Sequence, residues 1–279
     1  MPSGNSVYWK LFSAGLTRVQ AMEATLSNGI KAGALRPLGE LVSFTRVHKV
    51  YGEGVGGVHA LHDINLRVTP GEMVSVCGPC GSGKTSLLNL VGMLESATEG
   101  SVVVASLLVS KLSEQARADL RNDMIGFVFQ AFSLIPVLNA RENVLLPIML
   151  RGRLEQAELA AAHARADFLL AALGLGTQAL AYPARLDANQ SQRVAIARAL
   201  IARPRLVLAD EPTSRLDSAS VRLVMDLFAR EQQEHSTAFL LTTRDQRQFS
   251  GATRTLQLTD GRLLAAPGGS TRRPLRAEL

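Results

Sequence analysis

Long apolar runs, cysteines and clustered basic residues are all scarce in this sequence, and each absence excludes a class of protein. No stretch of 18 consecutive apolar residues occurs in the 279-residue chain, so the sequence predicts no membrane-spanning helix. Only two cysteines are present, which excludes a disulfide framework and fits a reducing cytoplasm. The net charge is +6, but no run of Lys or Arg exceeds two residues. Such a charge permits nucleic acid or an anionic membrane surface as a partner and establishes neither.

The composition is that of a globular chain, with 47% hydrophobic and 19% charged residues, enough for one large or two small domains. Residues 1–40 precede the first strand signal and are predicted to be an extension, which could form an amphipathic helix because apolar residues recur at helical spacing from Phe12 to Ile30. Packing on the domain, an upstream translation start and docking on a membrane or partner remain open for that segment. Residues 266–279 are predicted to be a disordered basic tail, because they are too polar to fold alone.

A strand, a glycine-rich turn and a helix are predicted between Met73 and Val91, because an apolar run stops at glycines and resumes at helical spacing. Glycines let backbone amides curl around phosphate oxygens, Lys84 reaches the β- and γ-phosphates, and the Thr85 hydroxyl ligates Mg²⁺. The helix directs its positive N-terminus at the same anion. The turn matches G-x-x-x-x-G-K-[ST] and consists of Gly78, Pro79, Cys80, Gly81, Ser82, Gly83, Lys84 and Thr85, followed by Ser86.

The two cysteines of this stretch also form a C-x-x-C pattern, which is typical of thioredoxin-like redox centres. Both are embedded in a complete phosphate-binding loop, and further parts of a nucleotide site follow in the sequence. We therefore interpret Cys77 as a small apolar residue that closes the strand, and Cys80 as a loop residue of about the size of serine.

Several further strands are predicted, and one of them ends in two carboxylates. The apolar run after Arg205 reaches Asp210 and Glu211, at the carboxyl end of a strand, where open α/β sheets bind their ligands. Asp210 can hold Mg²⁺ through water, and Glu211 can polarise an attacking water. Helical spacing dominates between residues 131 and 188, with its clearest part over 154–175. Other strands are predicted at residues 42–44, 64–68, 102–104, 125–129, 238–242, 255–258 and 262–265.

Residues 41–265 resemble the nucleotide-binding subunit of ABC transporters, closest to the lipoprotein-release and macrolide-export branch. The resemblance covers about 80% of the chain and includes GSGKTSLLNLVGMLESATEG, IGFVFQAFSLIPVLNARENVLLP, QRVAIARAL and LADEPTSRLDS. It implies an α/β fold with a P-loop NTPase (RecA-like) core, a mostly parallel sheet, an N-terminal antiparallel β region and a helical subdomain inserted at about residues 131–190.

The same resemblance assigns roles to individual residues. Tyr51 becomes the aromatic residue that stacks on the base, and Gly78 to Thr85 the phosphate loop. Gln130 senses the γ-phosphate and Mg²⁺, while Asp210 and Glu211 form the metal and general-base pair. The family joins two such subunits around two ATP molecules and drives a membrane permease from the cytoplasmic face of the membrane, with no nucleic acid expected as a partner.

The family's signature Leu-Ser-Gly-Gly-Gln stands here as Leu186-Asp187-Ala188-Asn189-Gln190. Asp187 and Gln190 form a capping-box pattern, so we expect the helix after them to survive. The anion site offered to the opposite subunit nevertheless gains a carboxylate, whose repulsion of one phosphate charge at about 4 Å is roughly 1 to 4 kcal/mol for dielectric constants from 80 to 20. Ala188 and Asn189 add side chains where glycine allows close approach.

A second departure lies at the strand end where the family has Thr-His-Asp, because this sequence has Thr243-Arg244-Asp245. Arg244 takes the place of the catalytic histidine. It can contact a phosphate, but it is permanently charged and cannot accept a hydrogen bond from an attacking water. The alternative is an arginine turned away into solvent.

The resemblance favours an ATP-binding subunit that couples ATP binding and slow hydrolysis to a permease, as a homo- or heterodimer. The departures at 187–189 and 244 leave a second interpretation open, a nucleotide-binding pseudo-ATPase that acts as a regulatory or structural partner. Soluble ABC proteins of DNA repair or translation are a third class. They normally carry a long insertion or a second cassette, and this sequence has neither.

Overall fold

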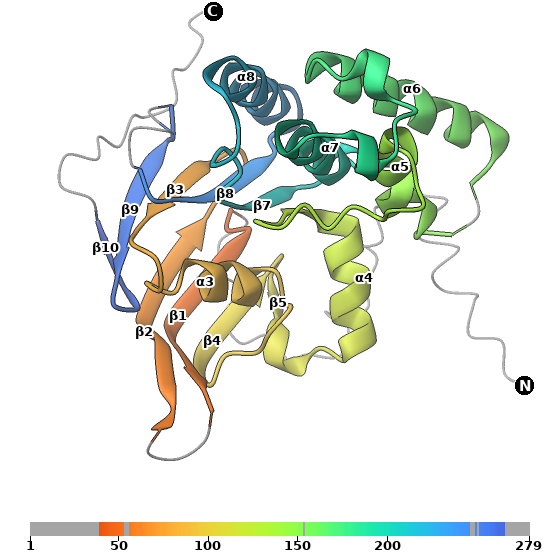
Figure 1. Cartoon of the computed structure of the whole chain (residues 1–279). Coiled ribbons are helices and arrows are strands. Elements are labelled where there is room, and N and C mark those ends of the chain that lie inside the picture. Colours follow the sequence, from red (N-terminus) through yellow and green to blue (C-terminus); the bar gives the residue numbers. More distant parts are fainter. Residues whose placement is uncertain (1–38, 53–55, 153, 246–248, 250, 266–279) are drawn as a thin grey trace, which may run out of the picture.

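The computed structural model of the chain describes residues 39–52, 56–152, 154–245, 249 and 251–265 (Figure 1). The predicted extension lies outside these residues except for its last two positions, and the predicted tail lies outside them entirely. Within the described part, no helix combines the length and the apolar character that a membrane crossing requires.

A six-stranded sheet forms the centre of the molecule, in the order β10-β9-β3-β8-β7-β6. Five strands run parallel, and only β10 pairs antiparallel, with β9. Every residue of β3, β7 and β8 is buried, which explains why these strands appear in the sequence as continuous apolar runs. The strands are β3 (Met73–Cys77), β6 (Ile125–Val128), β7 (Leu206–Asp210), β8 (Ala238–Thr243), β9 (Arg254–Thr259) and β10 (Arg262–Ala265).

A separate four-stranded antiparallel sheet, in the order β2-β1-β4-β5, is formed by strands that lie before and after α3 (Lys84–Val91) in the sequence. In β2, Ile64, Leu66 and Val68 are buried and the residues between them exposed, as the sequence predicts for a half-buried strand. The sequence pattern Val42-Ser43-Phe44 also predicts a strand that buries only alternate residues, and this prediction is wrong because Ser43 is buried like its neighbours. The strands are β1 (Val42–Tyr51), β2 (Val58–Val68), β4 (Glu99–Val104) and β5 (Leu107–Leu108).

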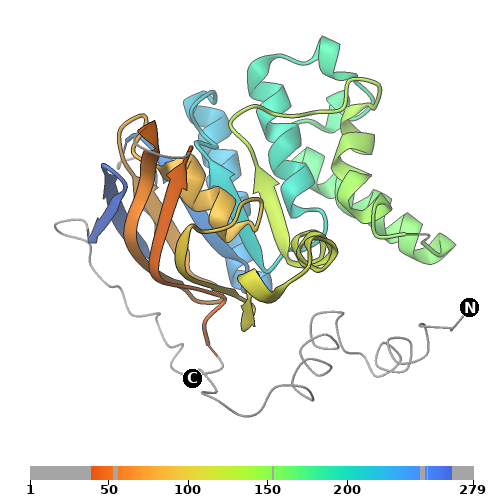
Figure 2. The same cartoon turned by 90° about the horizontal axis from the view of Figure 1, so that it is seen from below.

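Helices α5, α6, α7 and α8 lie on one face of the central sheet, while α3 and the antiparallel sheet lie on the other (Figures 1 and 2). α5 and α6 lie in the region predicted to be helical, whereas α4 and α8 have no counterpart in the sequence prediction. The α-helices are α3 (Lys84–Val91), α4 (Glu114–Met124), α5 (Ala140–Met149), α6 (Gln156–Ala172), α7 (Ala188–Leu200) and α8 (Ser218–His235), with short 3₁₀ segments at Val109–Lys111, Gly176–Gln178 and Pro183–Arg185.

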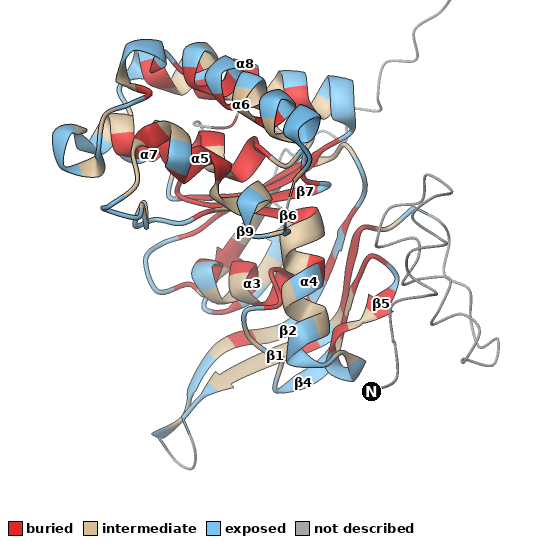
Figure 3. Cartoon of the chain, turned by 90° about the vertical axis from the view of Figure 1, so that its right-hand side faces the viewer, coloured by how far each residue is buried: buried red, intermediate tan, exposed pale blue. Residues whose placement is uncertain are grey.

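Alternate residues of the central strands enter two different hydrophobic cores. In β7, Leu206 and Leu208 pack with α3 and the antiparallel sheet, while Val207 and Ala209 pack with the helices on the opposite face. Figure 3 shows this buried interior as a continuous layer along the strands. Because each fully buried aliphatic side chain contributes roughly 1.5 to 3 kcal/mol, the central strands are firmly fixed, and so are the residues at their carboxyl ends. The predicted α/β fold with a mostly parallel sheet and an N-terminal antiparallel region is confirmed.

Candidate functional site

The turn between β3 and α3 has a backbone that only glycine can supply at several positions. Gly81 and Gly83 adopt left-handed φ angles of 76° and 99°. A Cβ atom at Gly83 would lie 2.4 Å from the Ala60 carbonyl oxygen, and one at Gly78 would lie 2.2 Å from the Leu258 carbonyl oxygen. The sequence motif is therefore a real constraint on the shape of this loop.

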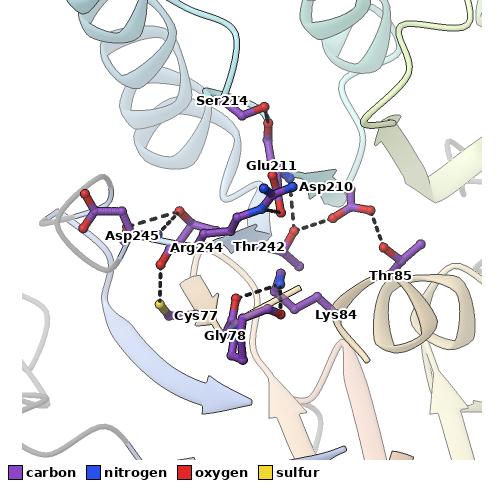
Figure 4. Close-up of polar contacts among 12 residues, drawn as sticks. Cys77, Gly78, Lys84, Thr85, Asp210, Glu211, Ser214, Thr242, Arg244 and Asp245 are labelled. Atoms are coloured by element: carbon purple, nitrogen blue, oxygen red, sulfur yellow. Dashed lines mark hydrogen bonds and ion pairs between the residues drawn. The ribbon is translucent and has the colours of Figure 1, made fainter. Parts of the chain in front are cut away.

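The start of α3 is arranged to accept an anion. Its N-cap, Gly83, offers no side chain to the first amides, and the first turn carries no acidic residue. Lys84 is buried, and its Nζ donates hydrogen bonds to the carbonyl oxygens of Gly78 at 2.8 Å and Pro79 at 2.7 Å (Figure 4). Among the residues that the structure describes, the buried Ser82 Oγ has no hydrogen-bond partner. The loop thus holds an ammonium and a buried, unpaired hydroxyl next to the N-terminal amides of α3.

Asp210 lies opposite this loop, between two threonines. Thr85 Oγ1 donates to Asp210 Oδ2 at 2.7 Å, and Thr242 Oγ1 donates to Asp210 Oδ1 at 2.6 Å (Figure 4). The bond between Thr85 and Asp210 joins the first residues of α3 to the carboxyl end of β7, 125 positions apart in the sequence. A hydroxyl and a carboxylate oxygen at this spacing suit a hard divalent cation such as Mg²⁺.

Glu211 follows β7 in a left-handed conformation with φ 48°, and its backbone N–H donates to Thr242 Oγ1 at 3.1 Å. Its carboxylate, only 9% exposed, accepts a hydrogen bond from Arg244 Nε at 2.7 Å (Figure 4). Hydrogen bonding to Glu211, together with its negative charge, raises the pKa of Arg244. The alternative of an arginine turned away into solvent is wrong, because the guanidinium is paired with the predicted general base.

Tyr51 is the last residue of β1, and its ring is held at the edge of the site. The hydroxyl donates to Glu95 Oε2 at 2.7 Å and lies 3.1 Å from Ser86 Oγ, whose own hydroxyl can donate to it. The ammonium of Lys49 lies 4.7 Å from the ring centroid. Burial is the main cause that raises the pKa of the Tyr51 phenol. The ring is therefore anchored at its polar end and supported by a cation.

These groups line one cavity of about 620 Å³, a volume within the range of small-molecule sites. Gly78, Pro79 and Ser82 belong to the loop without lining the cavity. The sequence-predicted residues that line it are Tyr51, Cys80, Gly81, Gly83, Lys84, Thr85, Ser86, Gln130, Asp210, Glu211 and Arg244. Sequence reasoning missed Val58, His59, Ala60, His62, Asp260 and Gly261, which carry no motif and reach the cavity from β2 and the turn between β9 and β10.

Asp187 and Gln190 do not line the cavity. They form the predicted capping box at the start of α7, where Asp187 Oδ1 accepts from the Gln190 N–H at 2.7 Å and Gln190 Oε1 accepts from the Asp187 N–H at 3.1 Å. Asn189 Nδ2 also donates to Asp217 Oδ2 at 2.8 Å, a bond that a glycine at 189 cannot make. The helix that follows the altered signature is therefore still formed, and Asn189 adds a hydrogen bond to the residue that caps α8.

Replacing Asp187 with alanine should lower the free energy of unfolding by about 1 kcal/mol, because the N-cap bond of α7 is lost. Replacing it with serine should leave the free energy within about 0.5 kcal/mol of the parent, since serine caps equally well. Urea denaturation of the three chains measures both values. Equal stability of the alanine variant and the parent would mean that this cap does not stabilise α7.

The two cysteines are both reduced, with Cys77 buried and Cys80 exposed. Cys77 Sγ donates to the Arg244 carbonyl oxygen at 3.6 Å, so this thiol faces the end of β8. Forming a Cys77–Cys80 disulfide would require the loop to rearrange and would distort its amides.

We expect oxidation by diamide to weaken ATP binding, and Cys80→Ser to remove that sensitivity. Calorimetric titration of reduced and oxidised samples is the measurement. Equal ATP affinity in the reduced and oxidised samples of the parent chain would contradict the predicted sensitivity to oxidation.

Comparison with known proteins agrees with this geometry. The ABC transporter family model matches residues 61–214. The lipoprotein-releasing system ATP-binding protein LolD of Bordetella avium is 40% identical over 216 residues, 77% of this chain and 92% of that protein. LolD of Shewanella denitrificans is 39% identical over 221 residues, 79% of this chain and 93% of that protein.

Two solved dimeric structures of an ATP-binding cassette, one described as a bacterial ABC transporter cassette and the other as a post-hydrolysis state bound to ADP and Pi, each superpose with a TM-score of 0.75. Each is 37% identical and covers 81% of this chain and 99% of the cassette. Motifs, fold, site geometry and relatives agree, and this chain belongs to the ABC transporter ATP-binding family.

Proposed function

We propose that this chain binds MgATP in the 620 Å³ cavity and couples that binding to a membrane permease. The observation that carries the proposal is the hydrogen bond between Thr85 and Asp210, because it places a hydroxyl and a carboxylate beside a phosphate-binding loop. A loop of this kind without an adjacent carboxylate could bind any phosphate. The Asp210 carboxylate makes the site suitable for a phosphate chain that carries a divalent cation.

The chain's own residues divide the nucleotide between them. The backbone N–H groups of Gly81 and Gly83 and those at the start of α3 hold the phosphates, while the unpaired Ser82 hydroxyl is buried within the loop. Lys84 exchanges its two loop carbonyls for phosphate oxygens. Tyr51 offers its ring to the base, while its hydroxyl stays tied to Glu95 and Ser86.

Thr85, Asp210 and Gln130 are the proposed protein ligands or water-mediated contacts of Mg²⁺. All three line the cavity, and their oxygen donors match the preference of this cation. Bound Mg²⁺ would neutralise phosphate charge. Thr242 fixes the orientation of the Asp210 carboxylate through its 2.6 Å bond.

Glu211 is the proposed general base, held at the carboxyl end of β7 by the bond from its amide to Thr242. Two features of this chain oppose hydrolysis. Arg244 occupies an oxygen of the Glu211 carboxylate, and Asp187 puts a negative charge where the signature meets the γ-phosphate of a second subunit. We therefore expect ATP to bind more robustly than it is hydrolysed.

The permease is proposed to dock in a groove of about 510 Å³ that is lined by residues of α4, β6, α5 and α7. The groove is largely apolar, and Phe129, Pro147 and Leu150 contribute to it. Phe129 and Leu150 are exposed, 37% and 71% respectively, so a partner can reach them. Phe129 directly precedes Gln130, which lines the nucleotide cavity, so docking there touches the segment that senses the nucleotide. The chain would thereby sit at the cytoplasmic face of the membrane.

The test is purification of the tagged full chain from its native membranes in mild detergent, followed by identification of the chains that accompany it. The proposal expects a stoichiometric integral membrane protein, which is lost with Phe129→Asp combined with Leu150→Asp. Phe168→Asp, on α6 and outside the groove, is the matched control because Phe168 is 42% exposed. A parent chain that carries no membrane protein, or variants that retain it, would contradict the proposed docking.

A further inference from the structure

The ion pair between Arg244 and Glu211 combines two groups that the reaction would need separately. Glu211 is 9% exposed and Arg244 is 53% exposed, so the carboxylate lies at the base of the cavity and the guanidinium lies in front of it. Figure 4 shows the arginine side chain running across the site to reach Glu211. A carboxylate that already accepts a charged hydrogen bond is a poorer acceptor for the proton of a water.

The backbones on both sides of the pair make hydrogen bonds of their own, so side-chain rotation is the simplest way to open the pair. Glu211 is held through its amide by Thr242 and through its carbonyl by Ser214 Oγ at 2.9 Å. The Arg244 carbonyl accepts a hydrogen bond from Cys77 Sγ in the neighbouring strand β3. The exposed guanidinium is the part with room to move.

A phosphate is the group that can compete for this guanidinium. The bond to Glu211 uses Nε, and a bidentate phosphate contact through Nε and one terminal nitrogen takes that donor away from the carboxylate. Arg244 lines the same cavity as Lys84 and Thr85, so a γ-phosphate bound there lies on its side of the site. Two negative charges on a phosphate attract the guanidinium more strongly than one carboxylate does at a comparable distance.

We propose that Arg244 is a positioning residue that holds Glu211 as its counter-ion and releases it only when a γ-phosphate takes the guanidinium. The inference rests on the proposed function, since it requires a nucleoside triphosphate in the cavity. It makes the availability of Glu211 depend on the γ-phosphate itself, through a permanent charge that a histidine at this position would lack.

The two single substitutions should shift nucleotide affinity in opposite directions. Glu211→Gln frees the guanidinium, so the affinity for MgAMP-PNP, a non-hydrolysable triphosphate, should rise about tenfold. Arg244→Gln uncovers the carboxylate, so the same affinity should fall about tenfold. MgADP has no γ-phosphate, and its affinity should change less than about twofold in both variants. Arg254→Gln is the matched control, since Arg254 forms an Nε to Oε1 pair with Glu72 at 3.0 Å outside the cavity.

Calorimetric titration gives the affinities, and NMR of the arginine Nε–H groups shows the release directly. The Arg244 signal, identified by its loss in Arg244→Gln, should move in the ligand-free Glu211→Gln chain. In the parent it should move with MgAMP-PNP and stay in place with MgADP, while the Arg254 signal stays in place with both.

The proposal would be overturned if each substitution changed the affinities for MgAMP-PNP and MgADP equally, or if the Arg244 signal stayed in place when MgAMP-PNP binds. In either case nucleotide binding itself would remain intact. A parent chain that binds neither nucleotide would instead contradict the proposed function.

Discussion

Lys84→Ala is expected to weaken MgATP binding at least about a hundredfold. Lys84 is buried with its ammonium inside the phosphate loop, where two carbonyl oxygens hold it at 2.8 and 2.7 Å until a phosphate replaces them. Hydrogen bonds to a charged group are each worth about 1.5 to 3 kcal/mol, so losing two of them corresponds to a hundredfold or more in affinity.

Binding of a fluorescent ATP analogue to the purified chain measures this loss. Lys111→Ala is the matched control, because Lys111 is exposed and does not line the cavity. Circular dichroism of each variant verifies that the fold is retained. If Lys84→Ala bound the nucleotide as tightly as the parent does, the assigned phosphate site would be wrong.

Restoring Ser-Gly-Gly at residues 187–189 is expected to raise ATP hydrolysis at least about tenfold. In the sandwich dimer that the family resemblance implies, Asp187 of one subunit would face the γ-phosphate held by the other. Relief of one charge repulsion of about 1.4 kcal/mol in the transition state corresponds to a tenfold change in rate. Serine at 187 preserves the cap of α7, whereas glycine at 189 removes the bond from Asn189 to Asp217, so Asp187→Ser alone is the control that isolates the charge.

Adding Arg244→His should increase the rate further in a homodimer, where both departures meet at one γ-phosphate. In a heterodimer with an ordinary partner, each site would contain one departure, and the two repairs would act at different sites. Steady-state phosphate release by the purified complex is measured for the parent, each repair and the double repair. A parent rate equal to that of the double repair would mean that these positions do not limit hydrolysis.

The sequence predicted the parts of the fold whose patterns are local. β3, β7 and β8 are continuous apolar runs because both faces of the central sheet are covered, and the glycines of the phosphate loop have no substitute in that turn. α4 and α8 escaped prediction. Both helices are polar on average, and their buried apolar residues form narrow stripes. In α4, only Leu120 and Met124 are buried.

The candidate site was predicted where it depends on a motif and missed where it depends on contact between distant segments. Lys84, Thr85, Asp210 and Glu211 lie together as the resemblance implies. The pairing of Glu211 with Arg244 was not predicted, because 33 residues separate them and only the parallel alignment of β7 with β8 brings their strand ends together. The bond between Asn189 and Asp217 is of the same kind. The division of the chain into an extension, an ATP-binding domain with a helical subdomain and a tail stays a prediction.

Titration of the full chain with MgATP in a calorimeter tests the central claim most directly. The account predicts saturable binding of one nucleotide per chain, which weakens when Mg²⁺ is removed, because Thr85 and Asp210 then lose the cation they are placed to hold. Absence of saturable heat at millimolar MgATP, or affinity that is indifferent to both Mg²⁺ and the Lys84→Ala substitution, would contradict it.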